Sequence, residues 1–283
     1  MEITTLKWIG KTLLFIFCLS VILSSCFTAR MSDKDMNSYF TNSKYTPKRI
    51  FFEAIGRKMH YVEAGDSTKT PLLFVHGSPG SWDDYKAFLK DSFLLKNCKI
   101  MAVDRPGFGF SGEGGAEITL KNQAAALLPI LKAQKKPVIL VGHSYGGPVV
   151  VRMAIDYPQY IKGIVLVAAS VSADLEPSNW YRYIFKYTPI RWAMPSFFRS
   201  SNDEILPLGR ELKKMESNWQ KIQCETVIIQ GEKDMLVPAE NATFAKQKLA
   251  HVKTTTILKK GMNHFVPWSD PDLILEGISR LIH

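Results

Sequence analysis

The stretch that decides the fold is Val138-Ile139-Leu140-Val141-Gly142-His143-Ser144-Tyr145-Gly146-Gly147. Its four leading apolar residues predict a strand buried on both faces, and a helical pattern follows the glycines. Ser144 therefore lies at the apex of a sharp turn between a strand and a helix. Small residues are needed beside such an apex, because a strained turn leaves no room for side chains there. The pattern predicts an exposed serine hydroxyl with helical N–H groups that stabilise a negatively charged oxygen.

Similar apolar runs, each a predicted strand, lie on both sides of this stretch and alternate with helical patterns. They are residues 71–75, 100–103, 164–169, 227–229 and 255–258. An earlier hairpin is predicted over residues 50–63, with its turn near Gly56. Alternating strands and helices predict a parallel, doubly wound α/β sheet, and a chain of 283 residues suits one large domain of this kind.

Residues 172–221 interrupt this alternation, since they contain no run typical of a buried strand. Their aromatic and proline residues are Trp180, Tyr181, Tyr183, Phe185, Tyr187, Trp192, Phe197, Phe198, Trp219, Pro177, Pro189, Pro195 and Pro207. An aromatic insertion broken by prolines predicts a helical cap over the site. We expect apolar, acyl-like substrates to enter beneath it.

A serine hydroxyl becomes a good nucleophile only when a base accepts its proton. Of six histidines, His264 is the favoured base, because it lies between the last predicted strand and the last helix. Loops at the carboxyl ends of parallel strands are where such sheets place their ligands. The competing histidines, in a hairpin, in other loops or at the chain end, are His60, His76, His143, His251 and His283.

A carboxylate should hold the imidazole in position and stabilise its cation. Asp234 is preferred, because it follows the apolar run at residues 227–229. Glu232 in the same loop and Asp174 after the preceding strand are the alternatives. The order serine, aspartate, histidine along the chain agrees with the order expected for one class of serine hydrolase.

The residues that would bind the oxyanion follow the run at residues 71–75. They are His76-Gly77-Ser78-Pro79-Gly80, in which the N–H of Ser78 is placed to donate to the oxyanion. The N–H of Tyr145 is the second predicted donor. The alternative is that residues 76–80 form only a tight turn.

The first residues predict export from the cytoplasm. Lys7 and Lys11 precede the apolar run at residues 13–23, which is short for a membrane span and typical of a secretory signal. The following Leu23-Ser24-Ser25-Cys26 resembles a bacterial lipobox, in which the cysteine is lipidated. A plain signal peptide and an uncleaved anchor are the alternatives.

We therefore divide the chain into a signal peptide at residues 1–25, a lipidated polar tether at 26–47 and a hydrolase-type domain at 48–283. The expected location is the cell envelope, on a membrane and outside the cytoplasm. Removal of residues 1–25 lowers the net charge from +10 to +9, because Lys7, Lys11 and Glu2 are lost. This charge suits an anionic surface, but no basic and aromatic stripe predicts nucleic-acid binding. Cys98 and Cys224 precede different predicted strands and are expected to be free, buried thiols.

Five motifs together resemble the α/β-hydrolase superfamily, in its capped, esterase-like and epoxide-hydrolase-like branch. They are residues 76–80, the segment Asp104-Arg105-Pro106-Gly107-Phe108-Gly109-Phe110-Ser111, the turn at Ser144, Gly231-Glu232-Lys233-Asp234, and His264. The resemblance runs from about Arg49 to the C-terminus. It implies an eight-stranded, mostly parallel sheet, with a helical cap after the sixth strand that matches residues 172–221. It implies no metal and no organic cofactor.

One departure narrows the expected activity. Epoxide hydrolases and haloalkane dehalogenases of this branch carry aspartate where this chain has Ser144. The sequence therefore favours hydrolysis of a carboxylic ester, a small-molecule substrate, through an acyl-enzyme. A carbon–carbon, thioester or amide hydrolase with the same triad is the alternative, and a non-catalytic binding protein is a third. The sequence makes no prediction of the oligomeric state.

Overall fold

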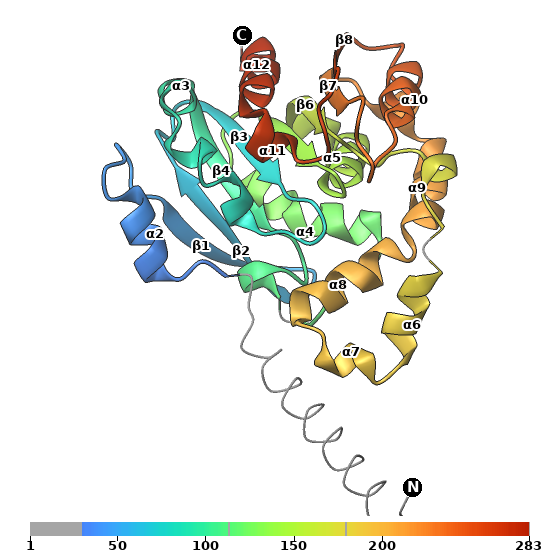
Figure 1. The fold of residues 1–283 in the computed structure, drawn as a ribbon. Helices are drawn as coiled ribbons and strands as arrows, with labels where there is room; N and C mark the ends of the chain where they lie inside the picture. The colour runs from blue at the N-terminus through green and yellow to red at the C-terminus, as the bar shows by residue number, and fades with distance from the viewer. Residues whose placement is uncertain (1–29, 113, 179, 283) are drawn as a thin grey trace, which may run out of the picture.

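The computed structural model describes residues 30–112, 114–178 and 180–282 (Figure 1). The predicted signal peptide and Cys26 lie outside the described residues. Within those residues, no helix has both the length and the apolar character needed to cross a bilayer.

One sheet organises the molecule, with the strand order β1-β2-β4-β3-β5-β6-β7-β8. The first two neighbouring pairs are antiparallel, and every other pair is parallel. This confirms the predicted eight-stranded, mostly parallel sheet. The strands are β1 (Lys48–Ala54), β2 (Arg57–Ala64), β3 (Thr70–Val75), β4 (Cys98–Asp104), β5 (Val138–His143), β6 (Ile161–Val167), β7 (Glu225–Gly231) and β8 (Thr254–Lys259).

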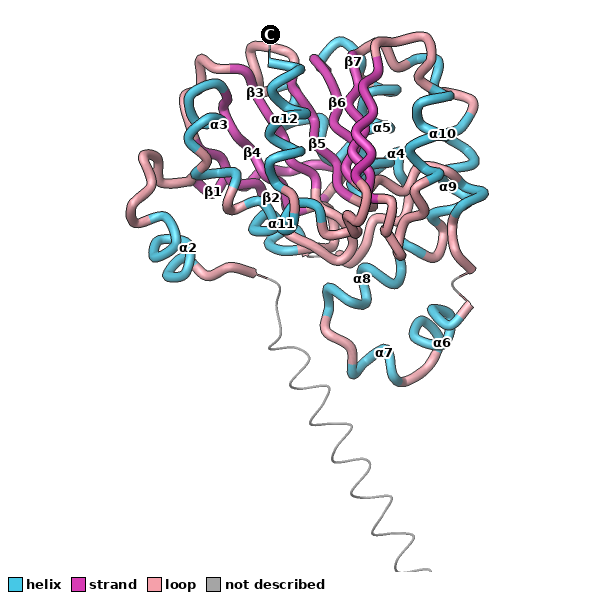
Figure 2. The backbone as a smooth tube through the Cα atoms, turned by 45° about the horizontal axis from the view of Figure 1, so that its top comes forward, coloured by secondary structure: helices cyan, strands magenta, loops and turns pink. Residues whose placement is uncertain are grey.

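Helices cover both faces of the sheet (Figure 2). Those packed against one face are α4 (Leu120–Lys132), α5 (Gly146–Asp156), α9 (Leu208–Glu216) and α10 (Glu240–Lys248). Those on the other face are α2 (Asp33–Phe40), α3 (Ser92–Asn97), α11 (Val266–Ser269) and α12 (Pro271–Ile282), with the 3₁₀ turns η1 (Trp82–Tyr85) and η2 (Phe88–Lys90). Because both faces are covered, β3 and β5 read as continuous apolar runs instead of alternating ones.

Helix α2 shows that the polar segment before the sheet is partly folded. Ser32 caps the helix by accepting a hydrogen bond from the amide of Asp35 at 3.1 Å. Met36 and Phe40, four residues apart on one side of the helix, are buried in the domain. The part of the expected tether at residues 33–40 is therefore docked, because its two apolar side chains complete the core beside α3.

The two cysteines of the described residues are free thiols. Cys98 opens β4 and Cys224 precedes β7, and three strands separate these two in the sheet. Cys98 is buried, as expected, whereas Cys224 is only partly buried. Burial raises the pKa of Cys98 to about 12 and that of Cys224 to about 11.

The cap follows β6 and consists of helices and turns in the part of residues 172–221 that the structure describes (Figure 1). Its elements are η5 (Ala173–Leu175), α6 (Tyr181–Tyr187), α7 (Ile190–Ala193), α8 (Ser196–Ile205), α9 and η6 (Trp219–Lys221). Helix α8 buries only polar side chains, those of Ser200, Ser201, Asn202 and Glu204. Neither α6 nor α7 has a buried residue.

This arrangement differs from the aromatic lid expected from the sequence. The large aromatic side chains of α6 and α7 are exposed, and the buried side of α8 is polar. The prediction that the aromatic residues cover an apolar site assumed that they face inward. Those of α6 and α7 do not, because these helices pack on α8, whose buried side chains are polar. Trp219, at the end of the cap, is buried in the core instead.

Candidate active site

Ser144 has the backbone strain expected of a residue at the apex of a sharp turn. Its φ of 52° lies in the left-handed region that side chains rarely adopt. Its amide donates to the carbonyl of Val167 on β6 at 2.9 Å, and its own carbonyl accepts from the amide of Gly147 at 3.0 Å. Within residues 138–150 every other residue is buried, and Ser144 alone is partly exposed. The turn therefore presents this one side chain from a buried frame.

The glycines on either side of Ser144 are required by close backbone contacts. A Cβ atom at Gly142 would lie 2.5 Å from the carbonyl oxygen of Gly146. A Cβ atom at Gly146 would lie 2.1 Å from the carbonyl oxygen of Val75 on β3. No side chain fits at these distances, so the turn can pack against β3 only with glycine at both positions.

The structure brings Asp234 and His264 into direct contact. Nδ1 of His264 lies 2.8 Å from Oδ2 of Asp234, and the aspartate side chain is fully buried. The other oxygen of Asp234 accepts hydrogen bonds from the amides of Leu236 and Val237 at 2.9 and 2.8 Å. Burial by itself would raise the pKa of Asp234, but the hydrogen bonds from His264 and these amides outweigh it and lower the pKa. The carboxylate is therefore charged at neutral pH and able to stabilise an imidazolium.

His264 lies beside the turn that carries Ser144. Its ring centroid is 4.9 Å from the ring of His143, and Nε2 of His143 donates to the carbonyl of His264 at 2.9 Å. Burial lowers the pKa of His143 to about 3, so this ring stays neutral and acts as a donor to the loop. Because His143 directly precedes Ser144, this hydrogen bond links the loop of His264 to the turn that carries Ser144.

A second histidine–aspartate pair exists elsewhere in the sheet. Nδ1 of His60 on β2 lies 2.8 Å from Oδ2 of Asp104 on β4, and both side chains are fully buried. Three strand positions separate β2 from β5, which is about 14 Å at the usual spacing of strands. Asp104 also accepts from the amides of Trp82 and Phe110 at 2.8 Å each. This pair fixes loops around β4 and is too distant to activate Ser144.

The other histidines of the described residues are engaged in backbone contacts. His76 is fully buried, with Nδ1 2.7 Å from the carbonyl of Gly77 and Nε2 accepting from the amide of Arg105 at 3.0 Å. Burial and the charge of Arg105 hold the pKa of His76 well below its usual range. His251 contacts the carbonyl of Ile222. The last histidine, His283, lies outside the described residues.

Neither of the two competing carboxylates forms a hydrogen bond with His264 in the part of the chain that the structure describes. Glu232 and Asp174 are both exposed, whereas Asp234 forms the contact with His264.

The loop predicted to bind the oxyanion lies directly against Ser144. A Cβ atom at Gly77 would lie 3.1 Å from the Cβ of Ser144. Arg105 donates to the carbonyl of His76 at 2.8 Å and to that of Gly77 at 2.7 Å. In a trans peptide the carbonyl and the following N–H point in opposite directions, so Arg105 turns the N–H of Ser78 away from itself. The guanidinium therefore sets the orientation of a predicted oxyanion donor.

The pair Arg105 and Glu204 was not predicted from the sequence. Nη1 and Nη2 of Arg105 lie 2.7 and 2.9 Å from the two carboxylate oxygens of Glu204, and neither side chain is exposed. Gln123 donates to the same carboxylate at 2.9 Å. Ser78 donates to Ser201 of α8 at 2.9 Å. Helix α8 is thus attached to the loop at residues 76–80 from two points.

The sequence indicated one member of this ion pair but not the other. Arg105 lies in the motif at residues 104–111, but Glu204 lies 99 residues later in a segment of mixed polarity. No spacing rule connects residues so far apart, and only the fold brings them together.

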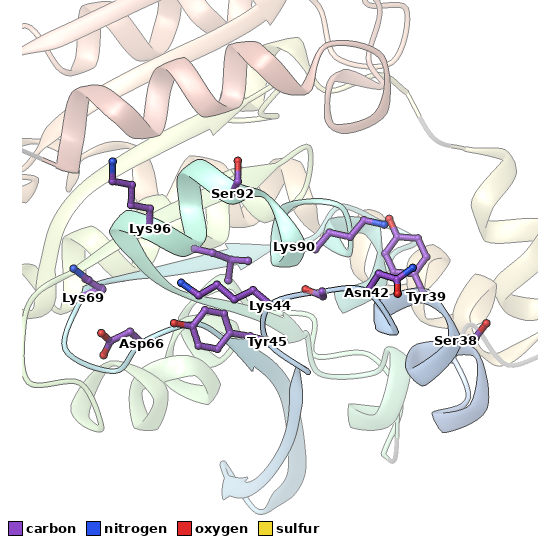
Figure 3. A pocket seen from close by; sticks show the side chains of 12 residues that line it. Ser38, Tyr39, Asn42, Lys44, Tyr45, Asp66, Lys69, Lys90, Ser92 and Lys96 are labelled. Atoms are coloured by element: carbon purple, nitrogen blue, oxygen red, sulfur yellow. The ribbon is translucent and has the colours of Figure 1, made fainter.

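A separate cavity of about 720 Å³ lies at the opposite edge of the sheet (Figure 3). Four lysines line it, and we call it the basic cleft; they are Lys44, Lys69, Lys90 and Lys96. Lys69 precedes β3 and Lys96 precedes β4, so the cleft lies at the amino ends of these parallel strands. Ser144 and Asp234 follow the carboxyl ends of β5 and β7. Among the described residues, no group of three or more histidine, cysteine or acidic side chains is arranged to hold a metal ion.

Comparisons with known proteins agree with this architecture. The chain is 26% identical over 237 residues to 2-hydroxy-6-oxo-2,4-heptadienoate hydrolase of Pseudomonas putida, covering 71% of this chain and 83% of that protein. It is 28% identical over 217 residues to the mouse serine hydrolase BPHL, covering 70% and 73%. The enol-lactonase of Burkholderia xenovorans has a similar fold, with a TM-score of 0.64, 13% identity and coverage of 82% and 99%.

A model of the alpha/beta hydrolase family matches residues 72–276, which include Ser78, Ser144, Asp234 and His264. This match spans well over half of the chain. The protein therefore belongs to the alpha/beta hydrolase family.

Proposed function

We propose that the protein is a serine hydrolase that cleaves carboxylic esters through an acyl-enzyme. The observation that carries this proposal is the contact between His264 and the buried Asp234, beside the turn that presents Ser144. A neutral serine needs a base with a fixed tautomer. The carboxylate on Nδ1 leaves Nε2 of His264 free to accept a proton.

In the first half of the proposed reaction, the hydroxyl oxygen of Ser144 attacks the carbonyl carbon of the ester while His264 accepts the hydroxyl proton. The carbonyl oxygen becomes an oxyanion, which the N–H groups of Ser78 and Tyr145 stabilise. When the tetrahedral intermediate collapses, the bond to the alcohol breaks and His264 gives its proton to the departing oxygen. In the second half, His264 takes a proton from water, which attacks the acyl-enzyme and releases the acid and Ser144.

The identity of residue 144 separates this activity from those of some relatives. Epoxide hydrolases of this superfamily form their intermediate on an aspartate at this position, and this chain has serine. One of the relatives is named a serine hydrolase. Another is named as a hydrolase of 2-hydroxy-6-oxo-2,4-heptadienoate, so hydrolysis of a different bond by the same three residues is the second candidate.

The test is the hydrolysis of p-nitrophenyl esters of increasing chain length, together with labelling by a fluorophosphonate. We expect the wild type to turn over the esters and to be labelled. Ser144→Ala should lose both, with turnover falling by a factor of about 10⁴ or more. Ser279→Ala, an exposed serine on α12, is the matched control and should keep both. Ester turnover that survives Ser144→Ala would exclude the proposed nucleophile.

We also propose that the protein is held on a membrane, outside the cytoplasm, by a lipid on Cys26. The apolar run at residues 13–23 and the sequence Leu23-Ser24-Ser25-Cys26 support this. Labelled palmitate should enter the wild type and fail to enter Cys26→Ser. Cys18→Ser, in the same segment, is the matched control and should be labelled. Equal labelling of Cys26→Ser would contradict the lipid tether.

A further inference from the structure

The outer side of the cap exposes an unusual group of large apolar side chains. We call it the aromatic face, and its members are Trp180, Tyr183, Ile184, Tyr187, Ile190 and Trp192. Trp180 is 67% exposed, Tyr187 72% and Trp192 60%. Tyr183 and Tyr187 lie one helical turn apart with stacked rings, at a centroid distance of 6.3 Å, so they share one side of α6. Exposed apolar surface of this kind usually marks a binding surface.

Polar contacts attach the aromatic face to the rest of the cap. Arg191 of α7 forms two hydrogen bonds with the carboxylate of Asp203 on α8, at 2.9 and 2.7 Å. The side-chain amide of Asn202 donates to the carbonyl of Arg182 at 3.0 Å. These contacts hold α6 and α7 against α8 and leave the aromatic rings outside. The rings of Trp180 and Tyr187 are therefore largely exposed to solvent.

The charge around the aromatic face is positive. Residues 177–202 contain Arg182, Lys186, Arg191 and Arg199 and no acidic residue. Asp203 of α8 balances the charge of Arg191, and the other three give the excess of positive charge. Nζ of Lys186 lies 5.4 Å from the centre of the Tyr187 ring, so an aromatic and a basic group occur together. Tryptophan and tyrosine are enriched where proteins meet the headgroup region of a bilayer, and basic residues favour anionic lipids there.

The start of the described chain lies at the same edge of the sheet as the cap. Nε of Arg30 donates to the carbonyl of Gly109 at 2.8 Å, and Gly109 begins η3 (Gly109–Ser111), just beyond the carboxyl end of β4. The cap follows the carboxyl end of β6, and Figures 1 and 2 show both on one side of the molecule. Cys26 precedes Arg30 by four residues, which span at most about 14 Å. A lipid at Cys26 would thus bring a bilayer to the edge that carries the cap.

We propose that the aromatic face is a docking surface for a phospholipid bilayer, and that it holds the cap against the membrane to which Cys26 is tethered. This rests on the proposed lipid tether. The docked orientation turns the edge of the sheet that carries Ser144 toward the bilayer. Esters dissolved in the membrane are then the substrates that reach the cap most directly. The basic cleft, at the amino ends of β3 and β4, faces away from the lipid.

The direct test uses the mature, lipid-modified protein, which begins at Cys26, in vesicles of phosphatidylcholine and phosphatidylglycerol with brominated acyl chains. Bromine quenches tryptophans that enter the bilayer. Trp82 and Trp219 are buried in the domain, whereas Trp180, Trp192 and Trp268 are exposed. We expect clear quenching of the wild type and loss of most of it in Trp180→Phe/Trp192→Phe. Trp219→Phe, which removes a buried tryptophan of the cap, is the matched control and should keep the quenching of the wild type.

A second measurement compares turnover of a long-chain ester presented in vesicles with turnover of a soluble short-chain ester. Replacing Trp180, Tyr187 and Trp192 by serine should lower the ratio of vesicle to soluble turnover by about tenfold, because the apolar contact with the bilayer is lost. Lys44→Glu/Lys96→Glu alters the basic cleft instead and should leave the ratio unchanged.

Two outcomes would overturn the docking surface. One is equal quenching in the wild type and in Trp180→Phe/Trp192→Phe, which would mean that the aromatic face meets water or another protein. The other is a lower turnover ratio in the variant of the basic cleft but not in the serine variant. The quenching does not depend on catalysis. A wild type that is quenched but inactive on every ester would refute the proposed activity and leave the docking surface intact.

Discussion

Helix α8 carries two adjacent carboxylates, and each is paired with an arginine in very different surroundings. Glu204 points into the domain, where its pair with Arg105 is completely buried. Asp203 points toward α7, where its pair with Arg191 is partly exposed, at 19% and 31%. Both pairs have two hydrogen bonds of similar length. Geometry alone therefore does not separate them, and the difference lies in the access of water.

This difference determines what each pair contributes. Water screens the exposed pair, so its net contribution to stability is small. The buried pair has lost its hydration, and removing one partner leaves an uncompensated charge inside the protein. The buried pair also contacts the loop that lies against Ser144, whereas the exposed pair only joins cap helices. Through Glu204, the inner side of α8 thus contacts Arg105 beside the candidate site. Through Asp203, its outer side contacts Arg191 of α7, which carries part of the aromatic face.

The largest expected effect concerns a third pair, Asp234 with His264, which is buried like the pair of Glu204 and Arg105. Asp234→Asn preserves the shape but removes the charge that fixes the histidine tautomer and stabilises its cation. We expect kcat for a soluble ester to fall by a factor of about 10⁴ with little loss of stability. Glu232→Gln, an exposed carboxylate in the same loop, is the control and should retain activity. A loss below tenfold in Asp234→Asn would mean that His264 does not depend on this carboxylate.

The second prediction breaks the two pairs of α8 separately. Glu204→Gln should lower the free energy of unfolding by about 3–5 kcal/mol, because Arg105 stays buried without its counterion. Asp203→Asn should lower it by about 0–1 kcal/mol. Urea denaturation followed by circular dichroism measures both. Equal losses in the two variants would show that burial does not distinguish the pairs.

The double variant Arg105→Met/Glu204→Leu separates the cost of an unpaired charge from the loss of packing. It should recover much of the stability lost in Glu204→Gln, since no charge is left buried. Its ester turnover should nevertheless be lower than that of the wild type, because no guanidinium orients the Gly77–Ser78 peptide. Recovery of full activity would show that Arg105 acts on stability alone.

The third prediction concerns Asp84, a partly buried carboxylate whose surroundings disfavour its charge. Burial, together with the nearby charge of Asp83, raises the pKa of Asp84 to about 7. A carboxyl whose pKa is raised on folding stabilises the protein while it is protonated. This contribution is complete below its unfolded pKa of about 4 and is lost as the pH rises through about 7. The stability of the wild type should fall over this range by up to about 1.4 kcal/mol per pH unit.

Asp84→Asn cannot titrate, so it should flatten this part of the pH profile of the urea midpoint. The lowered pKa of Asp234 has the opposite sign, and its contribution is lost only below about pH 4, as the pH falls through the folded pKa. The two groups therefore act in separate pH ranges. An unchanged slope between pH 4 and 7 in Asp84→Asn would assign the decline to another group.

Local patterns along the chain were sufficient to predict much of the fold. The apolar runs at residues 71–75, 100–103 and 138–141 all lie within strands, because a strand covered on both faces needs continuous apolar residues. The turn at Ser144 was predictable for a similar reason. Close backbone contacts, within the turn itself and with the neighbouring strand, allow only glycine at residues 142 and 146. The residues of the motif are therefore nearly sufficient to predict the turn.

The contact between Asp234 and His264 needed one more inference. Each residue follows a predicted strand, and parallel strands bring their carboxyl ends to one edge. The sequence therefore predicted the right edge for both side chains. The choice of Asp234 over Glu232 was made from position alone. The structure supplies the physical reason, because only Asp234 points into the buried edge, where amides and the imidazole hold it.

The cap is where the sequence was least informative. Its aromatic residues predicted an apolar lid, but α6 and α7 are short, and the aromatic residues at 181, 183, 185 and 187 alternate and so fall on more than one side of α6. Which side of such a helix is buried depends on what it packs against, and that partner is α8. The docking of α2 was missed for a similar reason, since Met36 and Phe40 are two apolar residues in a polar stretch.

The sequence by itself determined the strand pattern, the turn at Ser144 and the edge that collects Asp234 and His264, because short-range sterics and burial on both faces leave few alternatives. Only the tertiary structure decided that Arg105 meets Glu204 and that the aromatic face points outward. These features depend on contacts between segments far apart in the chain. Their free energies are set by whether water is present, and water access is a property of the assembled fold.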